Sequence, residues 1–200
     1  APARPGRYEP LLLNELLGQD RAWVDSTLAS LTLREAAAQL VIMWIPGAYL
    51  SPSDPDFAQR RRWVEEDGIG GIYLSIGSPH AFAAVANELQ ARARVPLLVT
   101  SDLEDGGPGM RLNHSYALPG LQPQGGGTAF PPTMAVGATG DEGRAWEYGR
   151  ITAREARAVG VHLNFAPVLD VNSNPENPVI GTRSFGGDPG AVARMGAAYI

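Results

Sequence analysis

Apolar residues along the chain follow two alternating patterns, one typical of short buried strands and one typical of amphipathic helices. Compact apolar runs predict four strands, at residues 40–45, 70–76, 96–102 and 161–166. Apolar residues at helical spacing predict helices around these runs, over residues 11–31, 32–39, 54–68, 78–89, 143–159 and 188–200. Strands that alternate with helices imply an α/β fold with a parallel sheet, either closed as a barrel or open and doubly wound.

Several of these helices have local start signals in the sequence. Thr32 and Glu35 have the spacing of a capping box, in which each side chain accepts a hydrogen bond from the backbone N–H of the other. Asp54, Ser78 and Asp188 each precede a proline, which is typical of an N-cap followed by the first helical residue. These signals fix where four of the predicted helices begin.

A polar segment follows the third predicted strand. Asp102, Glu104 and Asp105 stand where that strand ends, and a Gly-Gly and a Pro-Gly come after them. Loops at the carboxyl ends of barrel strands carry active sites, so the segment is either a candidate site or a solvated acidic turn. If strand alternation continued, Asp102 and Glu104 would share a side and could act on a glycosidic bond as a carboxylate pair. A single carboxylate could instead bind sugar hydroxyls, and the spacing leaves both readings open.

Arg183 lies in the second polar loop, which follows the fourth predicted strand. Its fork of donors suits a carboxylate, a carbonyl or a sugar oxygen, and the alternative is an ion pair with Asp102 or Asp170. Among the histidines, His162 falls within a strand and is expected to be a satisfied core residue, whereas His114 is the one histidine considered near a site. No two histidines have i, i+4 spacing, so no metal site is expected.

Composition narrows the classes of function. The chain has 200 residues, a net charge of −5 and 16 basic side chains, all arginine, without a basic stripe, so no nucleic-acid or anionic-membrane partner is expected. It contains no cysteine, which excludes disulfides and thiolate catalysis. No run of 18 apolar residues predicts a membrane-spanning segment. Residues 1–6 do not form a signal peptide, and we lean toward an exported protein, with a cytoplasmic one as the alternative.

The number of strand–helix units bears on the architecture. A closed (β/α)8 barrel needs eight units in about 250 residues, whereas four strands are predicted here. Half a barrel would expose two strand edges and one whole apolar face of its helices. We therefore expect that the chain is a fragment of a larger fold or that it pairs with something else.

Two stretches carry a resemblance to a known family. Residues 164–172, Asn-Phe-Ala-Pro-Val-Leu-Asp-Val-Asn, together with residues 174–186, closely resemble glycoside hydrolase family 3. The segment from Asp102 to Arg111 is similar to the D-x-E-G-G-x-V-x-R segment of the β-N-acetylglucosaminidase branch, with departures at Asp105 and at the Pro-Gly-Met before Arg111. The resemblance covers about residues 25–200, which leaves residues 1–24 as an N-terminal extension and helix.

This resemblance implies a fold, an activity and a set of roles. The fold would be a TIM-like (β/α)8 barrel, of which the chain covers the first half. The activity would be hydrolysis of β-glycosides with retention, through a covalent glycosyl-enzyme and without a cofactor. By the resemblance, Asp102 and Arg183 would bind the sugar and Arg111 would support them. Three further polar residues would shape the loops, namely Glu104, Asp170 and Asn172.

The resemblance also implies what lies outside the chain. The family's K-H-F-P-G-H-G segment, its Asp-His acid/base loop and its nucleophilic Asp are expected beyond Ile200, so no catalytic residue is assigned within the chain. The partners would be the remainder of the barrel and a glycan that contains N-acetylglucosamine, such as a cell-wall fragment. The isolated chain is expected to be inactive. The alternatives are a β-glucosidase of the same family and a non-catalytic carbohydrate-binding barrel module.

Overall fold

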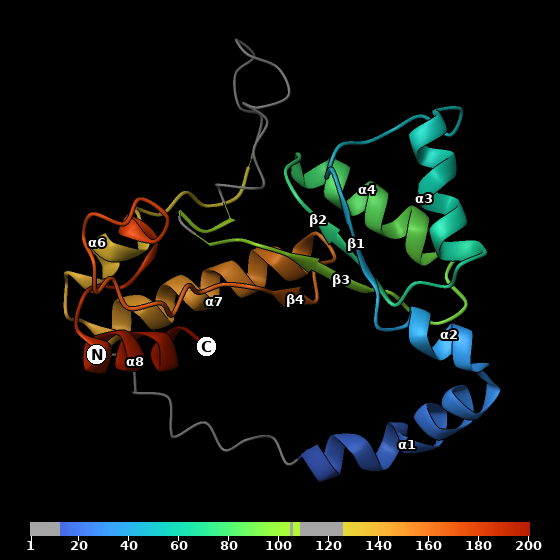
Figure 1. Ribbon diagram of the computed structural model, residues 1–200, viewed down its shortest axis with the longest axis horizontal. Helices are drawn as coiled ribbons and strands as arrows, with labels where there is room; N and C mark the ends of the chain where they lie inside the picture. The colour runs from blue at the N-terminus through green and yellow to red at the C-terminus, as the bar shows by residue number, and fades with distance from the viewer. Residues whose placement is uncertain (1–12, 105, 109–125) are drawn as a thin grey trace.

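The computed structural model describes residues 13–104, 106–108 and 126–200, and its centre is a parallel four-stranded sheet (Figure 1). Neighbouring strands are consecutive in the chain, in the order β1 (Ile42–Ile45), β2 (Gly71–Leu74), β3 (Leu98–Ser101) and β4 (Leu163–Asn164). Each strand runs parallel to the next. The α/β fold with a parallel sheet is therefore confirmed, and the sheet forms part of a barrel.

Helices precede, connect and follow these strands. Their bounds are α1 (Leu13–Ser30), α2 (Leu33–Ala38), α3 (Pro55–Glu65), α4 (Pro79–Gln90), α6 (Thr133–Gly137), α7 (Glu142–Ala158) and α8 (Pro189–Tyr199), with a 3-10 turn η1 (Gly181–Arg183) before α8. The short helix α6 was not predicted, because its sequence Thr-Met-Ala-Val-Gly has no capping side chain and too few residues for a periodic pattern. The other helices match the sequence predictions within a few residues.

The predicted helix starts are confirmed. The Thr32 hydroxyl accepts a hydrogen bond from the Glu35 N–H, and the Glu35 carboxylate accepts one from the Thr32 N–H at 2.7 Å. The N-cap side chains of Asp54, Ser78 and Asp188 each accept a backbone hydrogen bond from the first turn of their helix. These contacts satisfy N–H groups that a helix cannot satisfy internally.

One face of the sheet is covered by helices and forms the main core. Phe82, Val85 and Leu89 from α4 pack with Val64 from α3 against this face, and α7 adds Ala156. The strands contribute alternate residues to the same core, namely Ile45, Ile72, Leu74 and Val99. The strand period of two residues places these side chains on a single face.

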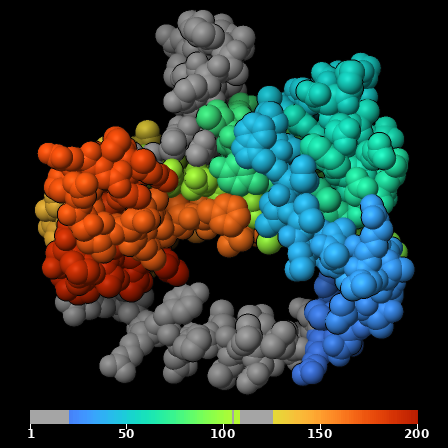
Figure 2. Space-filling model, in the orientation of Figure 1, coloured from blue at the N-terminus to red at the C-terminus, as the bar shows by residue number. Residues whose placement is uncertain are grey.

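On the opposite face of the sheet, no helix of the described residues covers the strands, and most of its apolar side chains are exposed. Its residues follow from the register, in which Ile42 aligns with Gly71 and Leu98, and Trp44 aligns with Tyr73, Thr100 and Leu163. We call Ile42, Trp44, Tyr73, Leu98, Leu163 and Phe165 the open face. Figure 2 shows the molecule hollowed beside it, between the orange residues around β4 and the blue residues around β1. The prediction that residues 40–45 form a fully buried strand is therefore wrong, because helices cover one side only.

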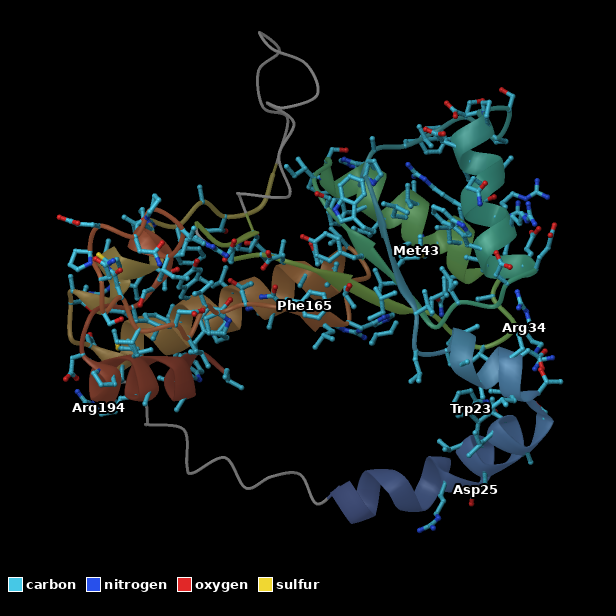
Figure 3. All side chains as sticks on the ribbon, in the orientation of Figure 1. Trp23, Asp25, Arg34, Met43, Phe165 and Arg194 are labelled. Carbon is cyan, nitrogen blue, oxygen red and sulfur yellow. The ribbon has the colours of Figure 1, made fainter. Side chains whose placement is uncertain are left out.

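Two aromatic rings meet on the open face. Tyr73 on β2 and Phe165 after β4 stack with their ring centroids 6.1 Å apart. They span β3, and Thr100 on that middle strand is fully buried beneath them. Figure 3 shows Phe165 on the side of the sheet away from α7.

A second, smaller core joins the C-terminal helices. It is built from residues of α6, α7, α8 and the segment after η1, namely Val136, Ala145, Tyr148, Phe185, Val192 and Met195. Gly149 allows α7 and α8 to touch, because a Cβ at this position would overlap the carbonyl oxygen of Tyr199. This core packs α8 against α7 (Figure 1).

The helix α1 lies apart from the sheet (Figure 1). Trp23 and Leu28 on this helix are exposed, so its apolar side has no partner among the described residues. The predicted boundary between residues 24 and 25 falls within α1 and stays a prediction. No helix in the described part of the chain is long and apolar enough to cross a membrane.

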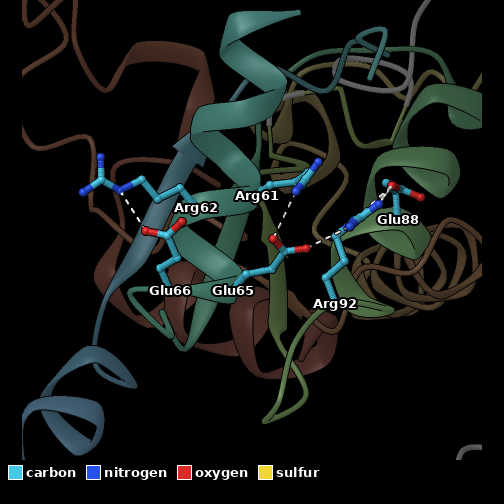
Figure 4. A network of polar contacts seen from close by, with 6 residues as sticks. All are labelled: Arg61, Arg62, Glu65, Glu66, Glu88 and Arg92. Carbon is cyan, nitrogen blue, oxygen red and sulfur yellow. Dashed lines mark hydrogen bonds and ion pairs between the residues drawn. The ribbon is translucent and has the colours of Figure 1, made fainter. Parts of the chain in front are cut away.

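The outer surface of α3 and α4 carries a network of ion pairs (Figure 4). Arg92 donates to Glu65 at 2.8 Å and to Glu88 at 2.6 Å, and Arg61 reaches Glu65 at 3.4 Å. All of these side chains are partly solvated, so each pair contributes little to stability.

Candidate functional site

The candidate site begins where β3 ends. Ser101 is fully buried and its hydroxyl donates to the carbonyl of Leu74 at 2.8 Å, which fixes the end of the strand. Asp102 is half-buried, and the next two residues, Leu103 and Glu104, are both buried. Strand alternation therefore stops at Asp102, and the expectation that Asp102 and Glu104 share a strand side is wrong.

The backbone after Asp102 is held from three sides. The Leu103 N–H donates to the Asn164 Oδ1 at 2.9 Å, which ties the loop to β4. The carbonyl oxygen of Glu104 accepts a hydrogen bond from the Tyr148 hydroxyl on α7 and another from the Gly107 N–H at 2.8 Å. The φ of Gly107 is +68°, and a Cβ there would contact the rings of Phe130 and Tyr148, so only glycine suits this turn.

Arg183 reaches this loop from η1. Its Nε and Nη2 both donate to the Glu104 Oε2, at 3.1 and 2.9 Å, and its Nη1 donates to the carbonyl of Val179 at 3.0 Å. The Arg183 side chain is 37% exposed and the Glu104 side chain is 9% exposed. The ion pair that the sequence offered as an alternative for Arg183 is thus present, but its carboxylate is Glu104 rather than Asp102 or Asp170.

The loop before η1 is closed by hydrogen bonds to the segment after it. The Ser184 hydroxyl lies at hydrogen-bond distance from the carbonyl oxygens of Asp170 and Gly186, and the Asn172 N–H donates to the Gly186 carbonyl at 2.9 Å. The side chain of Asp170 is exposed, whereas the Asn172 Oδ1 is buried without a partner among the described residues. The roles of Asp170 and Asn172 in shaping this loop stay predictions.

A partly buried tyrosine, Tyr199, lies near Asp102 and Asn164. Tyr199 on α8 accepts a hydrogen bond from the Asn164 Nδ2 at 3.4 Å, and its ring meets Tyr148 edge-on with centroids 5.1 Å apart. Burial raises the pKa of the Tyr199 hydroxyl, the hydrogen bond with Asn164 opposes that rise, and the negative charge of Asp102 adds to it. Tyr199 is therefore a neutral support for the site at physiological pH.

The remaining predicted residues lie elsewhere. Arg111, Asp105 and His114 are outside the described residues, so the supporting role of Arg111 stays a prediction. His162 is exposed at the start of β4, where its Nδ1 accepts from the Val99 N–H at 3.1 Å, so its assignment to the core is wrong. The imidazole ring of His162 lies just before β4 and is not covered by a helix of the described residues.

Sequence reasoning missed three residues that organise the site, Asn164, Tyr148 and Tyr199. Asn164 gave one signal, since a polar residue at the end of an apolar strand points to the functional edge of a sheet. Tyr148 and Tyr199 match the apolar period of their helices, which gives no sign of a role in the site. In the described part of the chain, no cluster of three or more His, Cys, Asp or Glu side chains could hold a metal ion.

Comparison with known proteins defines the class of the fold and site. Residues 32–200 match the model of the glycosyl hydrolase family 3 N-terminal domain, and the chain belongs to this family. The resemblance inferred from residues 164–186 is therefore confirmed. Several of the solved structures that are similar to the chain are also named as family 3 proteins.

The similar proteins carry related names. The chain is 33% identical over 180 residues to a β-N-acetylglucosaminidase/β-glucosidase of Cellulomonas fimi, covering 90% of the chain and 28% of that protein. It is 38% identical to the structure of a family 3 β-N-acetylglucosaminidase from Paenibacillus sp., with a TM-score of 0.70, covering 86% of the chain and 30% of that structure. A β-glucoside phosphorylase structure is similar with a TM-score of 0.73 and 29% identity, covering 90% of the chain and 29% of that structure. The chain thus spans less than a third of the length of these relatives.

Proposed function

We propose that this chain forms the sugar-holding half of a family 3 β-N-acetylglucosaminidase barrel. The reaction would remove β-linked N-acetylglucosamine from a glycan with retention of configuration, through a covalent glycosyl-enzyme. The nucleophile and the acid/base would come from parts of the family 3 enzyme that this chain does not contain. No cofactor is needed, because carboxyl and imidazole groups suffice for this chemistry.

The observation that carries the proposal is the meeting of two loops at one edge of the sheet. Arg183 is held against the loop of Asp102 through Glu104, although the residues come from the ends of different strands. In a barrel, residues from several strand ends converge on the substrate at this edge. The names of the similar proteins, most of which include β-N-acetylglucosaminidase or β-hexosaminidase, favour N-acetylglucosamine as the sugar.

In this proposal Asp102 and Arg183 contact the same sugar with opposite hydrogen-bonding capacity. The Asp102 carboxylate accepts hydrogen bonds from hydroxyl groups, and the Arg183 guanidinium donates to hydroxyl or carbonyl oxygens. Such charge-assisted hydrogen bonds are stronger than neutral ones and are most useful where they tighten in the transition state. Arg111 would support this pair from the same loop.

We further propose that the open face is the inside of the barrel, covered by the remainder of the same fold. Parallel strands of barrels are buried on both sides, and their inward side chains fill the barrel interior. The open face has the apolar character of such an interior, with Trp44, Leu98 and Leu163 among its residues. The glycan would enter at the edge of this interior, where Asp102 lies.

The test is hydrolysis of aryl glycosides by the full-length natural protein. We expect turnover of 4-nitrophenyl β-N-acetylglucosaminide with a higher kcat/KM than that of the β-glucoside, and no turnover by the isolated 200-residue chain. Replacing Asp102 or Arg183 by Ala should lower kcat/KM about 100-fold. Activity that is independent of both residues would contradict the assignment, and a full-length protein that binds N-acetylglucosamine without cleaving it would be a non-catalytic module.

A second candidate is activity on β-glucosides. The Cellulomonas fimi relative carries both activities in its name, and one similar structure is named as a phosphorylase of β-glucosides. The assay should therefore include the aryl β-glucoside with and without inorganic phosphate. A higher kcat/KM for the β-glucoside would favour this second candidate function. Formation of a sugar 1-phosphate would identify phosphate as the acceptor.

A further inference from the structure

We propose that Glu104 is a positioning residue, whose carboxylate fixes the Arg183 guanidinium in the orientation that binds the sugar. This inference rests on the proposed function, since it assigns a role within the same site. It gives Glu104 a task distinct from shaping its own loop and from acting as an acid, base or nucleophile. Three features of the ion pair between Glu104 and Arg183 support this role.

The first feature is the geometry of the ion pair. Two edges of the guanidinium are engaged, because Nε and Nη2 donate to one oxygen of Glu104 while Nη1 donates to the Val179 carbonyl. These contacts define the plane of the guanidinium and its rotation within that plane. A flexible Arg side chain loses rotamer entropy when it binds a ligand, and a guanidinium that is already held loses less of it.

The second feature is the rigidity of Glu104 itself. Its carbonyl accepts from the Tyr148 hydroxyl and from Gly107, and the preceding Leu103 is anchored to Asn164. The carboxylate therefore projects from a backbone that is fixed to α7 and to β4. Because the Glu104 backbone is fixed, its carboxylate can hold the Arg183 guanidinium in one orientation.

The third feature is the contrast in burial. The Glu104 side chain is 9% exposed and the Arg183 side chain is 37% exposed, so the cation lies between the buried carboxylate and solvent. An approaching sugar meets Arg183 and not Glu104. Glu104 therefore acts on substrate through Arg183, in the way that outer ligands orient a group that binds directly.

The experiment is a double-mutant cycle in the full-length natural protein, with E104Q, R183A and the double variant. Gln has the shape of Glu but lacks its charge, so it weakens the hold on Arg183 with little change in volume. We expect E104Q to lower kcat/KM about 10-fold to 100-fold, mainly through KM. In the R183A background the same change should alter kcat/KM less than about twofold.

The matched control is E65Q, which removes one carboxylate from the Arg92 network on the outer surface (Figure 4). Arg92 and Glu65 are 2.8 Å apart, close to the 2.9 Å of the Arg183 pair, but Glu65 is the last residue of α3 and Arg92 follows the end of α4, away from the site. We expect E65Q to keep kcat/KM within twofold of the wild type. Effects of E104Q and R183A that multiply, or an E104Q variant as active as E65Q, would overturn the positioning role.

A second readout does not depend on activity. The Nε–H of Arg183 should give a sharp, slowly exchanging NMR signal that is absent in R183K, and E104Q should broaden or lose it while E65Q retains it. An unchanged signal in E104Q would overturn the inference. If the wild-type protein cleaves none of the aryl glycosides, the proposed function fails, and this signal still decides whether Glu104 positions Arg183.

Discussion

The two faces of the sheet are built from similar residues and have opposite surroundings. On the covered face, Ile45, Ile72 and Leu74 are 0–1% exposed beneath α3 and α4. On the open face, Ile42, Trp44, Leu98 and Leu163 are 39%, 59%, 41% and 40% exposed. Contiguous exposed apolar residues on this scale mark a surface that is normally in contact with something else.

The difference in exposure between the two faces shows that apolar residues in a strand do not reveal which layer of structure covers them. The sequence of an apolar strand has the same pattern whether helices of the described chain cover one side of the strand or both sides are covered. In this chain the covered face is buried by its own helices, whereas the open face is exposed among the described residues, and we propose that further structure covers it. Four predictions test this comparison, in order of decreasing effect.

The largest effect is expected at Trp44 on the open face. In the full-length protein Trp44→Ala should lower the free energy of unfolding by about 3 kcal/mol or more, because a large side chain is lost from the barrel interior. In the isolated 200-residue chain the same change should cost less than about 1 kcal/mol, because Trp44 is largely exposed there. Urea denaturation of both forms measures the difference, and equal losses would refute a covered open face.

The covered face should respond in the same way in both forms. Leu74 is fully buried, so Leu74→Ala should cost about 3 kcal/mol in the isolated chain and in the full-length protein alike. Denaturant unfolding is again the measurement, with the surface change Arg62→Ala as a control that should stay within about 0.5 kcal/mol. A small loss at Leu74 would mean that this core is not formed in solution.

The helix layer of the covered face should depend on its caps. The Ser78 hydroxyl accepts from the Ala81 N–H at 3.1 Å at the start of α4, so Ser78→Ala should cost about 1 kcal/mol. Thermal unfolding measures the loss. Ser53→Ala, at a serine before α3 that is not its N-cap, should leave the melting temperature almost unchanged, and an equal loss there would argue against capping as the cause.

The smallest effect is a pH dependence at the amino-terminal end of the sheet. Partial burial lowers the pKa of His162, and the positive charge of Arg157 adds to this. The unfolded chain then binds the proton more readily than the folded one, so the contribution is complete above the ordinary histidine pKa of about 6.5 and is lost as the pH falls through the lowered value. Melting temperatures at pH 7.5 and pH 5.5 should differ more for the wild type than for His162→Asn, and equal differences would exclude His162.

Local features of the fold could be predicted from the sequence because their causes are local. The Thr32–Glu35 capping box and the caps Asp54, Ser78 and Asp188 lie within one turn of the helices that they start. The strands were placed correctly, although they are shorter than their apolar runs. Exposure of the open face escaped prediction, because it depends on the presence of a second layer.

The candidate site was predictable in its location but not in its contacts. The polar residues after the third and fourth predicted strands do lie at one edge of the sheet. The partner of Arg183 could not be deduced, because the chain leaves the strand at Asp102 and buries Leu103 and Glu104 in succession. The direction of a carboxylate after such a turn depends on distant contacts with Asn164 and Tyr148.

The ion pair between Glu104 and Arg183 also constrains the order in which the protein assembles. The two residues are 79 positions apart, so during synthesis the carboxylate is made long before its cation. A carboxylate buried without a partner is costly, and Glu104 therefore cannot settle into its final position until η1 is present. The nascent chain can form α2, α3, α4 and the first three strands early, while the edge of the sheet that carries Glu104 must wait for residue 183.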